Sequence, residues 1–375
     1  MNSGYSLYIH IPFCNSFCDY CDFYSITTEN KNDDYINAYL SALVKDIKNQ
    51  ITRFSVKNIV TAYIGGGTPS VLGKKICFLL DELNKMACFK PAEFTIEANP
   101  ESITGDFLHL CQDSGINRLS LGVQTLHEPS RKAVNRKGEL KIIEENIALA
   151  AKYFKDLISF DLIAGLPYQN DEILISDINR LVSYEPSHFS LYSMTIEDGT
   201  ALNEKIKDGI ITIEDRDKTD SIWLCGRQAI KEYGYKQYEV SNFAKEGREC
   251  VHNMRYWQMN SWMGAGAAAC GTIINNNGTA RRFSYASDVD AYIKNPSIDA
   301  AFTEEINKDT FMKESLMMGF RCLEGPNPNV FFNRFGISIE DCISNTLLKY
   351  KERDKMMFLN SFLTEAFSEI DNLKL

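Results

Sequence analysis

Short apolar runs alternate with longer amphipathic runs along the first half of the chain. The short runs are rich in β-branched and aromatic residues and are bounded by Gly, Pro, Asn or Asp, a pattern typical of β-strands. Six strands are predicted, over residues 6–11, 58–64, 93–98, 118–123, 157–163 and 188–194. The longer runs show the three- and four-residue apolar spacing of amphipathic helices. Helices are predicted over residues 34–53, 73–87, 140–154 and 171–183.

Repeated strand–helix units at this spacing predict an α/β fold. Parallel strands joined by helical crossovers form either a barrel or a doubly wound sheet. Because the pattern supplies six units, we expect an incomplete (β/α)6 barrel that makes up a first domain over residues 1–205.

The regular alternation of predicted strands and helices ends in the second half of the chain. A helix is predicted over residues 214–233, followed by a mixed segment over 235–257 and a run of small residues over 264–271. From about residue 286 the chain is largely helical and polar. We therefore expect a second, smaller domain over residues 206–375, mixed at first and then largely helical, that packs against the barrel.

Composition places the chain among globular proteins and argues against nucleic-acid binding. Apolar residues make up 44% of the 375 residues, which is ample for a large core. Forty Lys and Arg against fifty Asp and Glu give a net charge of −10, and the basic pairs are isolated. A nucleic-acid partner usually requires a basic stripe, because phosphate neutralisation supplies most of the affinity. No nucleic-acid partner is expected.

Two further observations bear on the compartment. No stretch approaches the length of about 18 apolar residues that a membrane helix needs, and no cationic and apolar secretion signal is found. Eleven cysteines indicate thiols or metal ligands in a reducing compartment, and not a disulfide framework. We expect a cytoplasmic protein.

Three cysteines lie close together just after the first predicted strand, at Cys14, Cys18 and Cys21. In a barrel, the loops that follow strands form the active face. Thiolates grouped in one short loop favour a soft metal or an iron–sulfur cluster. The number three is informative, because a [4Fe–4S] cluster held by three cysteines keeps one iron open to another ligand.

Two alternatives remain open for this triplet. Zinc could take His10 as a fourth ligand, although structural zinc pairs usually stand further apart in sequence. The spacing of four and then three residues could also mark one face of a buried helix, which Pro12 and the preceding strand oppose.

Chemistry-bearing residues also follow the next strands. A glycine run, residues 65–67, precedes Thr68 and would let the chain approach a ligand closely, although it could be only a tight turn. Glu97, Gln124 and Asp161 stand at or near strand ends, where a polar side chain more often serves a ligand than the core. The alternative for these side chains is a cap or an ion pair with a nearby arginine.

The motifs that carry these residues occur in a fixed order along the chain. They are Tyr-x-His-x-Pro-Phe-Cys, Gly-Gly-Gly-Thr-Pro-Ser, Glu-x-Asn-Pro, Gly-Val-Gln and Asp-Leu-Ile-x-Gly-Leu-Pro. With the Cys-x3-Cys-x2-Cys spacing, the set resembles the radical S-adenosylmethionine proteins, and among them the oxygen-independent coproporphyrinogen III oxidases and the HemW-type haem chaperones. The resemblance runs from about Tyr8 to Trp257 and is weaker beyond.

The resemblance implies the cofactors and roles for individual residues. The open iron would bind S-adenosylmethionine, which one-electron reduction cleaves to a 5′-deoxyadenosyl radical. Tyr8, Gly66 and Glu97 would contact this cluster-bound molecule. A second S-adenosylmethionine, a feature of the oxidase branch, would contact Tyr20, Gly67, Thr68, Gln124, Arg136, Asp161 and Thr195.

Two features distinguish the branches. The oxidases carry a further cysteine where this chain has Phe23, and the segment from His252 to Trp257 matches the His-Asn-x-x-Tyr-Trp motif of HemW-like proteins. One departure is Gly138, which stands where chaperone relatives usually have a histidine. The resemblance therefore favours a chaperone that passes haem to an acceptor protein. The alternative is an oxidase that decarboxylates two propionates of coproporphyrinogen III to vinyl groups.

A haem carrier needs an axial iron ligand and flat apolar contacts. His252 and Cys250 offer an imidazole and a thiolate, and Tyr256 and Trp257 offer flat faces. The alternative is that His252 is a hydrogen-bonded core residue, and His10 is a second candidate ligand. The expected partners are haem, an acceptor protein and an electron donor for the cluster, with membrane contact expected only through the acceptor.

Overall fold

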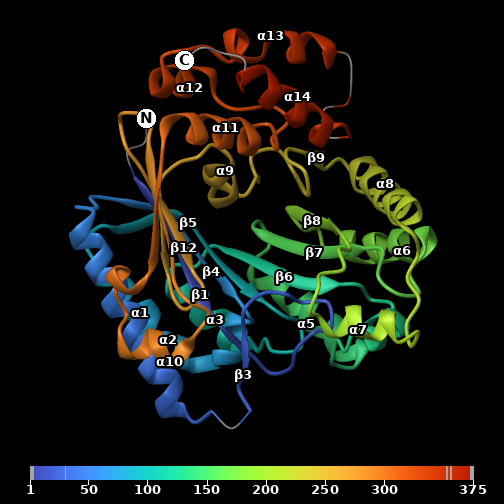
Figure 1. The fold of residues 1–375 in the computed structure, drawn as a ribbon. Coiled ribbons are helices and arrows are strands. Elements are labelled where there is room, and N and C mark those ends of the chain that lie inside the picture. The colour runs from blue at the N-terminus through green and yellow to red at the C-terminus, as the bar shows by residue number, and fades with distance from the viewer. Residues whose placement is uncertain (1–3, 30, 352–353, 355–356, 372–375) are drawn as a thin grey trace.

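A computed structural model describes residues 4–29, 31–351, 354 and 357–371 of the chain (Figure 1). All six predicted strands are present, and they lie side by side and parallel in the order of the sequence. They are β1 (Tyr5–Ile11), β4 (Ile59–Gly66), β5 (Phe89–Ala98), β6 (Arg118–Gln124), β7 (Ile158–Ala164) and β8 (His188–Ser193). The predicted α/β fold is confirmed.

Helices connect these parallel strands, as the apolar periodicity predicts. They are α1 (Asp33–Arg53), η1 (Pro69–Lys75), α2 (Ile76–Asn84), α3 (Gly105–Asp113), α4 (Glu128–Ala133), α5 (Leu140–Tyr153) and α6 (Asp171–Val182). The predicted helix over 73–87 is present in shorter form as α2, since residues up to Lys75 belong to η1, in which Gly73 leaves the helical path with a φ of 52°. Asn32, Thr104 and Asn170 accept backbone N–H groups at the starts of α1, α3 and α6, which fixes where those helices begin.

The second half of the chain extends the sheet at both edges. On the β1 side, β11 (Trp262–Ala265) pairs parallel to β1, and β12 (Cys270–Ile274), β13 (Ala280–Ser284) and β14 (Phe302–Ile306) follow in antiparallel order. On the β8 side lie β10 (Asn242–Ala244) and β9 (Lys236–Gln237). Among the described residues the result is an open sheet of 12 strands, so the barrel is incomplete, as expected.

The strands β11 and β12 cover the small-residue run for which the sequence predicted no element. Glycine allows β11 and β12 to lie close together, since a Cβ atom on Gly264 would lie 2.1 Å from the carbonyl oxygen of Cys270. The two strands approach each other too closely for a side chain at that position. Such short, glycine-containing strands lack the alternation that identifies a strand in sequence.

The remaining elements lie between these strands or follow them. They are β2 (Phe13–Cys14), β3 (Ile26–Thr27), α7 (Ala201–Lys207), α8 (Arg216–Glu232), α9 (Val251–Trp257), α10 (Val289–Lys294), η2 (Ile298–Ala300), α11 (Lys308–Gly319), α12 (Pro328–Phe335), α13 (Ile339–Lys349) and α14 (Leu359–Asp371). The helix predicted over 214–233 is confirmed as α8. Figure 1 shows the C-terminal helices α11 to α14 grouped at one end of the molecule, beyond α9.

Three apolar clusters hold the described chain together, and the smallest consists of Val134, Ile163, Leu166, Leu202 and Ile211. The main core continues past the expected domain boundary at residue 205, as far as Ile298. A second cluster is built mainly from residues 306–370, and Met259 and Ala280 join it from the sheet region. The division at residue 205 stays a prediction. Within the described residues, no helix combines the length and the apolar character needed to cross a bilayer.

Candidate functional site

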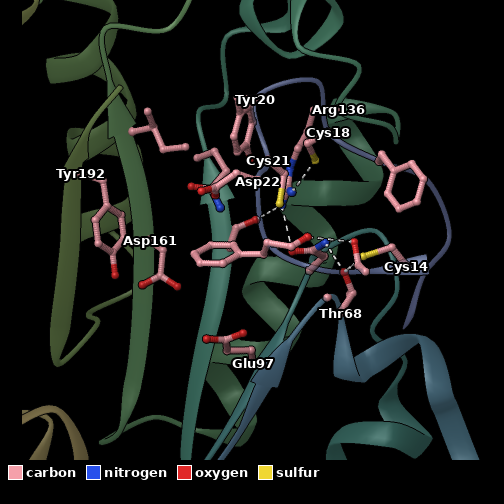
Figure 2. A pocket seen from close by; sticks show the side chains of 18 of the residues that line it. Cys14, Cys18, Tyr20, Cys21, Asp22, Thr68, Glu97, Arg136, Asp161 and Tyr192 are labelled. Atoms are coloured by element: carbon pink, nitrogen blue, oxygen red, sulfur yellow. Dashed lines mark hydrogen bonds between the residues drawn. The ribbon is translucent and has the colours of Figure 1, made fainter. Parts of the chain in front are cut away.

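A cavity of about 380 Å³ opens beside the carboxyl ends of the parallel strands, a size suited to a small organic ligand (Figure 2). Twelve of the predicted site residues line it: Cys14, Cys18, Tyr20, Cys21, Gly66, Gly67, Thr68, Glu97, Gln124, Arg136, Asp161 and Thr195. Figure 2 shows Asp161 and Tyr192 across the cavity from the three cysteines. The parallel topology brings these residues together, because the carboxyl halves of parallel strands and the loops that follow them meet at one edge of the sheet.

The cysteines occupy a loop that short backbone contacts fix against the sheet. Cys14 ends β2, and its carbonyl oxygen accepts the N–H of Thr28 at 2.9 Å. The Cys14 Sγ atom lies 3.5 Å from Thr68 Oγ1, and the Nη1 atom of Arg136 donates to Cys18 Sγ at 3.4 Å. Burial raises the pKa of Cys14, and burial raises the pKa of Cys21 to about 11. These thiols therefore need a bound metal or cation to ionise near neutral pH.

The donor set fits an iron–sulfur cluster better than zinc. Both ring nitrogens of His10 already have partners, because Nε2 donates to the Tyr24 carbonyl oxygen and Nδ1 accepts the Tyr8 hydroxyl, each at 3.0 Å. The fourth ligand of the zinc alternative is therefore engaged elsewhere. In the part of the chain that the structure describes, no three His, Cys, Asp or Glu side chains already surround a metal position. The three thiols share one cavity and would converge on the cluster that they hold.

The glycine run lies directly against the cysteine loop. Gly66 has a φ of 119°, a conformation open to glycine, and a Cβ atom there would lie 2.7 Å from the His10 ring. A Cβ atom on Gly67 would lie 2.9 Å from Cys14 Sγ and 2.8 Å from the Phe13 carbonyl oxygen. The run is therefore more than a tight turn, because the approach of β1 requires glycine at position 66 and the approach of the cysteine loop requires glycine at position 67.

Glu97, at the end of β5, presents a half-buried carboxylate to the cavity. Its Oε1 atom accepts the Tyr63 hydroxyl at 2.8 Å, and its Oε2 atom accepts the Gly66 N–H at 3.1 Å. Burial raises the pKa of Glu97 to about 7, while these two donors oppose the rise. Such a group favours a cationic ligand, because a nearby positive charge stabilises the ionised form.

Arg136 joins the cysteine loop to the strand ends. Its Nη2 atom donates to Asn99 Oδ1 at 3.0 Å and also to the Gly122 carbonyl oxygen, and its Nε atom forms an ion pair with Glu101 at 3.4 Å. Next to it, Gln124 has a φ of 66°, an uncommon conformation for a residue with a side chain. Among the described residues, the buried Gln124 Oε1 atom has no hydrogen-bond partner. A ligand donor in the cavity would satisfy it.

Asp161, on β7, is held by serine hydroxyls from its own strand and from the two neighbouring strands. Ser120 donates to Oδ2 at 2.8 Å and Ser159 donates to Oδ1 at 3.3 Å. Burial raises the pKa of Asp161, whereas hydrogen bonds from Ser190, Ser120 and Ser159 lower it. Ionised or protonated, the carboxyl group is fixed in orientation from three sides.

Two predicted site residues do not line the cavity. The Tyr8 hydroxyl donates to the His10 ring, so Tyr8 contacts a residue of β1 and does not face the cavity. His252 is 1% exposed, and its ring lies 3.0 Å from Thr61 Oγ1 and 2.8 Å from the Tyr256 hydroxyl. The neighbouring Cys250 thiol is buried against Glu93. Haem ligation by His252 stays a prediction, and it would require both ring contacts to break.

Several lining residues were missed from the sequence. They are Phe17, Asp22, Phe23, Asn99, Ser120, Tyr192, Ser193, Met194 and Glu197. Asn99 and Tyr192 stand at the carboxyl ends of β5 and β8, so the same strand-end argument that selected Glu97 applies to them. Phe17 and Phe23 are 48% and 70% exposed, and exposure of this kind cannot be recognised from sequence.

Known proteins are similar to this chain in sequence and in fold. Residues 8–181 match the family model of the radical SAM superfamily. The heme chaperone HemW of Lactococcus lactis is 30% identical over 361 residues, covering 94% of this chain and 92% of the relative. The heme chaperone HemW of Escherichia coli is 32% identical, covering 90% of this chain and 88% of the relative.

A solved structure supports the fold. The coproporphyrinogen III oxidase HemN of Escherichia coli aligns with a TM-score of 0.79 at 21% identity, covering 98% of this chain and 90% of that chain. This likeness extends beyond the six-stranded barrel, and it confirms the expected radical SAM architecture with an added C-terminal region. With its fold, its cysteine loop and its nearly full-length relatives, the chain belongs to the HemW family of the radical SAM superfamily.

Proposed function

We propose that this protein is a haem chaperone of the HemW kind, which binds a [4Fe–4S] cluster, S-adenosylmethionine and haem and delivers haem to an acceptor protein. The observation that carries the proposal is the collinear similarity to curated heme chaperones over more than nine-tenths of the chain. That similarity includes the C-terminal half, which a shared barrel alone would not explain.

The residues of the cavity suit the two proposed resident cofactors. Cys14, Cys18 and Cys21 would hold the cluster, which when bound supplies an iron with an open coordination position. Glu97 would face a positively charged part of S-adenosylmethionine, and the unpartnered Gln124 Oε1 atom would accept one of its donors. Arg136 would place a guanidinium next to the Cys18 sulfur and stabilise its thiolate.

The cellular setting is part of the proposal. All eleven cysteines are free thiols, which suits a reducing compartment such as the cytoplasm. An electron donor for the cluster and a haem acceptor would be the protein partners. Phe23 is 70% exposed at the mouth of the cavity, so a partner could approach the cluster loop there.

Two anaerobic assays test the function on the same reconstituted protein. In the first, haemin is titrated and its absorbance reports loading, for which the proposal expects about one haem per chain at saturation. In the second, S-adenosylmethionine, a strong reductant and coproporphyrinogen III are supplied, and no protoporphyrinogen is expected. Failure to load haem would overturn the chaperone, and Cys18-dependent product would establish an oxidase instead.

A further inference from the structure

A chain of buried and partly buried hydrogen bonds leads from the cavity into the barrel interior. It begins at Asp161, whose Oδ1 atom accepts the Ser159 hydroxyl at 3.3 Å. Ser159 Oγ lies 2.7 Å from His188 Nδ1, and His188 Nε2 lies 2.9 Å from the Tyr238 hydroxyl. The Tyr238 oxygen in turn accepts the backbone N–H of Cys250 at 3.1 Å. Four contacts thus link the cavity to the residue that precedes α9.

The Cys250 donor at one end and the Asp161 acceptor at the other determine which atom donates in each hydrogen bond of this chain. The Cys250 amide can only donate, so it uses a lone pair of the Tyr238 oxygen and leaves the phenolic hydrogen for His188 Nε2. An imidazole that accepts at Nε2 carries its hydrogen on Nδ1 and donates it to Ser159. The Ser159 hydrogen is then available to Asp161.

The opposite direction is less favourable. If Nε2 carried the hydrogen, the Tyr238 oxygen would accept twice and its own buried hydrogen would lose its partner. Ser159 would then donate to His188 Nδ1, and Asp161 would lose one of its serine donors. Unpartnered buried polar groups of this kind are costly, and Ser159 and His188 are only 1% and 2% exposed.

We propose that His188 and Tyr238 are positioning residues, which fix the direction of this chain and thereby hold Asp161 as an oriented acceptor for the adenosyl ligand of the cavity. The inference rests on the proposed binding of S-adenosylmethionine. It assigns Tyr238, a residue of the C-terminal half, to the support of a ligand site on the barrel.

The charges around the chain are compatible with this role. Burial lowers the pKa of His188 well below its usual value, and Arg118 lowers it further, so the ring stays neutral near neutral pH. Arg118 on β6 also favours the ionised form of Asp161. The other titratable groups that face Asp161 are Glu97 on β5, Tyr63 on β4 and Tyr192 on β8.

The imidazole tautomer gives a direct test that needs no ligand. With ¹⁵N-labelled histidine, the signals of the protein's five histidines can be assigned by single substitutions. His188 is expected to be neutral with hydrogen on Nδ1. Tyr238→Phe removes the hydroxyl hydrogen that holds Nε2 as an acceptor, so the tautomer with hydrogen on Nε2 is expected to become populated in that variant. Tyr235→Phe is the matched control, because Tyr235 donates to the Pro186 carbonyl oxygen and lies outside the chain. Hydrogen on Nε2 of His188 in the parent protein would overturn the inference.

Ligand affinity tests the consequence for the cavity. Tyr238→Phe is expected to weaken S-adenosylmethionine binding to the reconstituted protein about tenfold, as expected when a charge-assisted contact is impaired. Tyr235→Phe should bind as the parent does. Ser159→Ala, which cuts the chain next to Asp161, serves as a second variant and should show a similar loss. Parental affinity in both Tyr238→Phe and Ser159→Ala would overturn the role of the chain.

The two readouts separate failure of this inference from failure of the proposed function. If the parent protein did not bind S-adenosylmethionine, the proposed cofactor would be lost, and the positioning role that depends on it would be lost as well. The tautomer of His188 would still establish or overturn the direction of the chain. A shifted tautomer in Tyr238→Phe with parental affinity would overturn only the positioning of Asp161.

Discussion

The Nε2 atom of His252 lies 2.8 Å from the hydroxyl oxygen of Tyr256, one turn later in α9. On the other side of the ring, Nδ1 lies 3.0 Å from Thr61 on β4. The N–H groups of Val251 and His252 donate to the two carboxylate oxygens of Glu93 on β5, at 2.9 and 2.8 Å. Hydrogen bonds to β4 and β5 therefore hold the start of α9 against the barrel, and each polar group named here has a partner.

Replacing His252 with leucine should destabilise the fold by about 2–3 kcal/mol, because the hydroxyls of Thr61 and Tyr256 each lose a buried partner. Denaturant unfolding of the two proteins measures the difference. The control is His109→Leu, since His109 is exposed on α3. Haem loading of the folded His252→Leu protein tests the predicted ligation separately. Lost loading is expected if His252 is a haem ligand, and loading at the parental level would rule that role out.

The same residue predicts a dependence of stability on pH. Burial lowers the pKa of His252 to about 3, below the usual value of 6.5. As the pH falls from about 6.5 towards 3, His252 becomes protonated in the unfolded chain but stays neutral in the folded protein. The free energy of unfolding therefore falls by up to about 1.4 kcal/mol per pH unit through this residue. The free energy of unfolding of parent and His252→Leu, measured from pH 7 to pH 5, should therefore converge. A constant difference would contradict the neutral buried ring.

Gly67→Ala should displace the cysteine loop. The added Cβ atom would lie 2.9 Å from Cys14 Sγ and 2.8 Å from a backbone carbonyl oxygen, and overpacking of this kind costs about 1–3 kcal/mol. We expect lower iron and sulfide content after anaerobic reconstitution. Gly105→Ala is the matched control, because the nearest atom to its Cβ would be 3.9 Å away. Equal cluster content in the two variants would show that the close approach does not matter.

Removing any one thiol of the loop should abolish stable cluster binding. Serine at Cys14, Cys18 or Cys21 leaves two thiolate ligands, and oxygen ligands hold iron–sulfur clusters less well. Iron, sulfide and the visible absorption of the reconstituted proteins measure the loss. Cys225→Ser, on α8 and outside the cavity, should retain the parent's cluster content. A similar loss in that control would point to general damage and not to ligation.

S-adenosylmethionine binding should weaken in mild acid through Glu97. Burial raises the pKa of Glu97 to about 7, and a cationic ligand needs the ionised carboxylate. Affinity should therefore be highest above pH 7 and fall by up to about tenfold per pH unit below it. Calorimetry on reconstituted parent and Glu97→Gln, between pH 6 and pH 8, compares the slopes. An unchanged slope in Glu97→Gln would assign the titration to another group.

The sequence by itself determined the strands and the chemistry of the loops that follow them. Strand β5, for example, combines β-branched and aromatic residues with a carboxylate near its end, and both features are local. The Cys-x3-Cys-x2-Cys spacing is local as well, which is why the cysteine loop was recognised before its surroundings were known. A parallel arrangement of the strands then places Glu97, Gln124 and Asp161 near the same edge of the sheet.

The tertiary structure decided which of the recognised side chains reach the cavity. Tyr8 and His252 carry suitable chemistry, yet both turn to partners within the fold, because burial requires every polar atom to be satisfied. The extension of the sheet by β11 and β12 also depended on close backbone approach between distant segments. Burial and pairing are properties of contacts between residues far apart in sequence, so no local pattern specifies them.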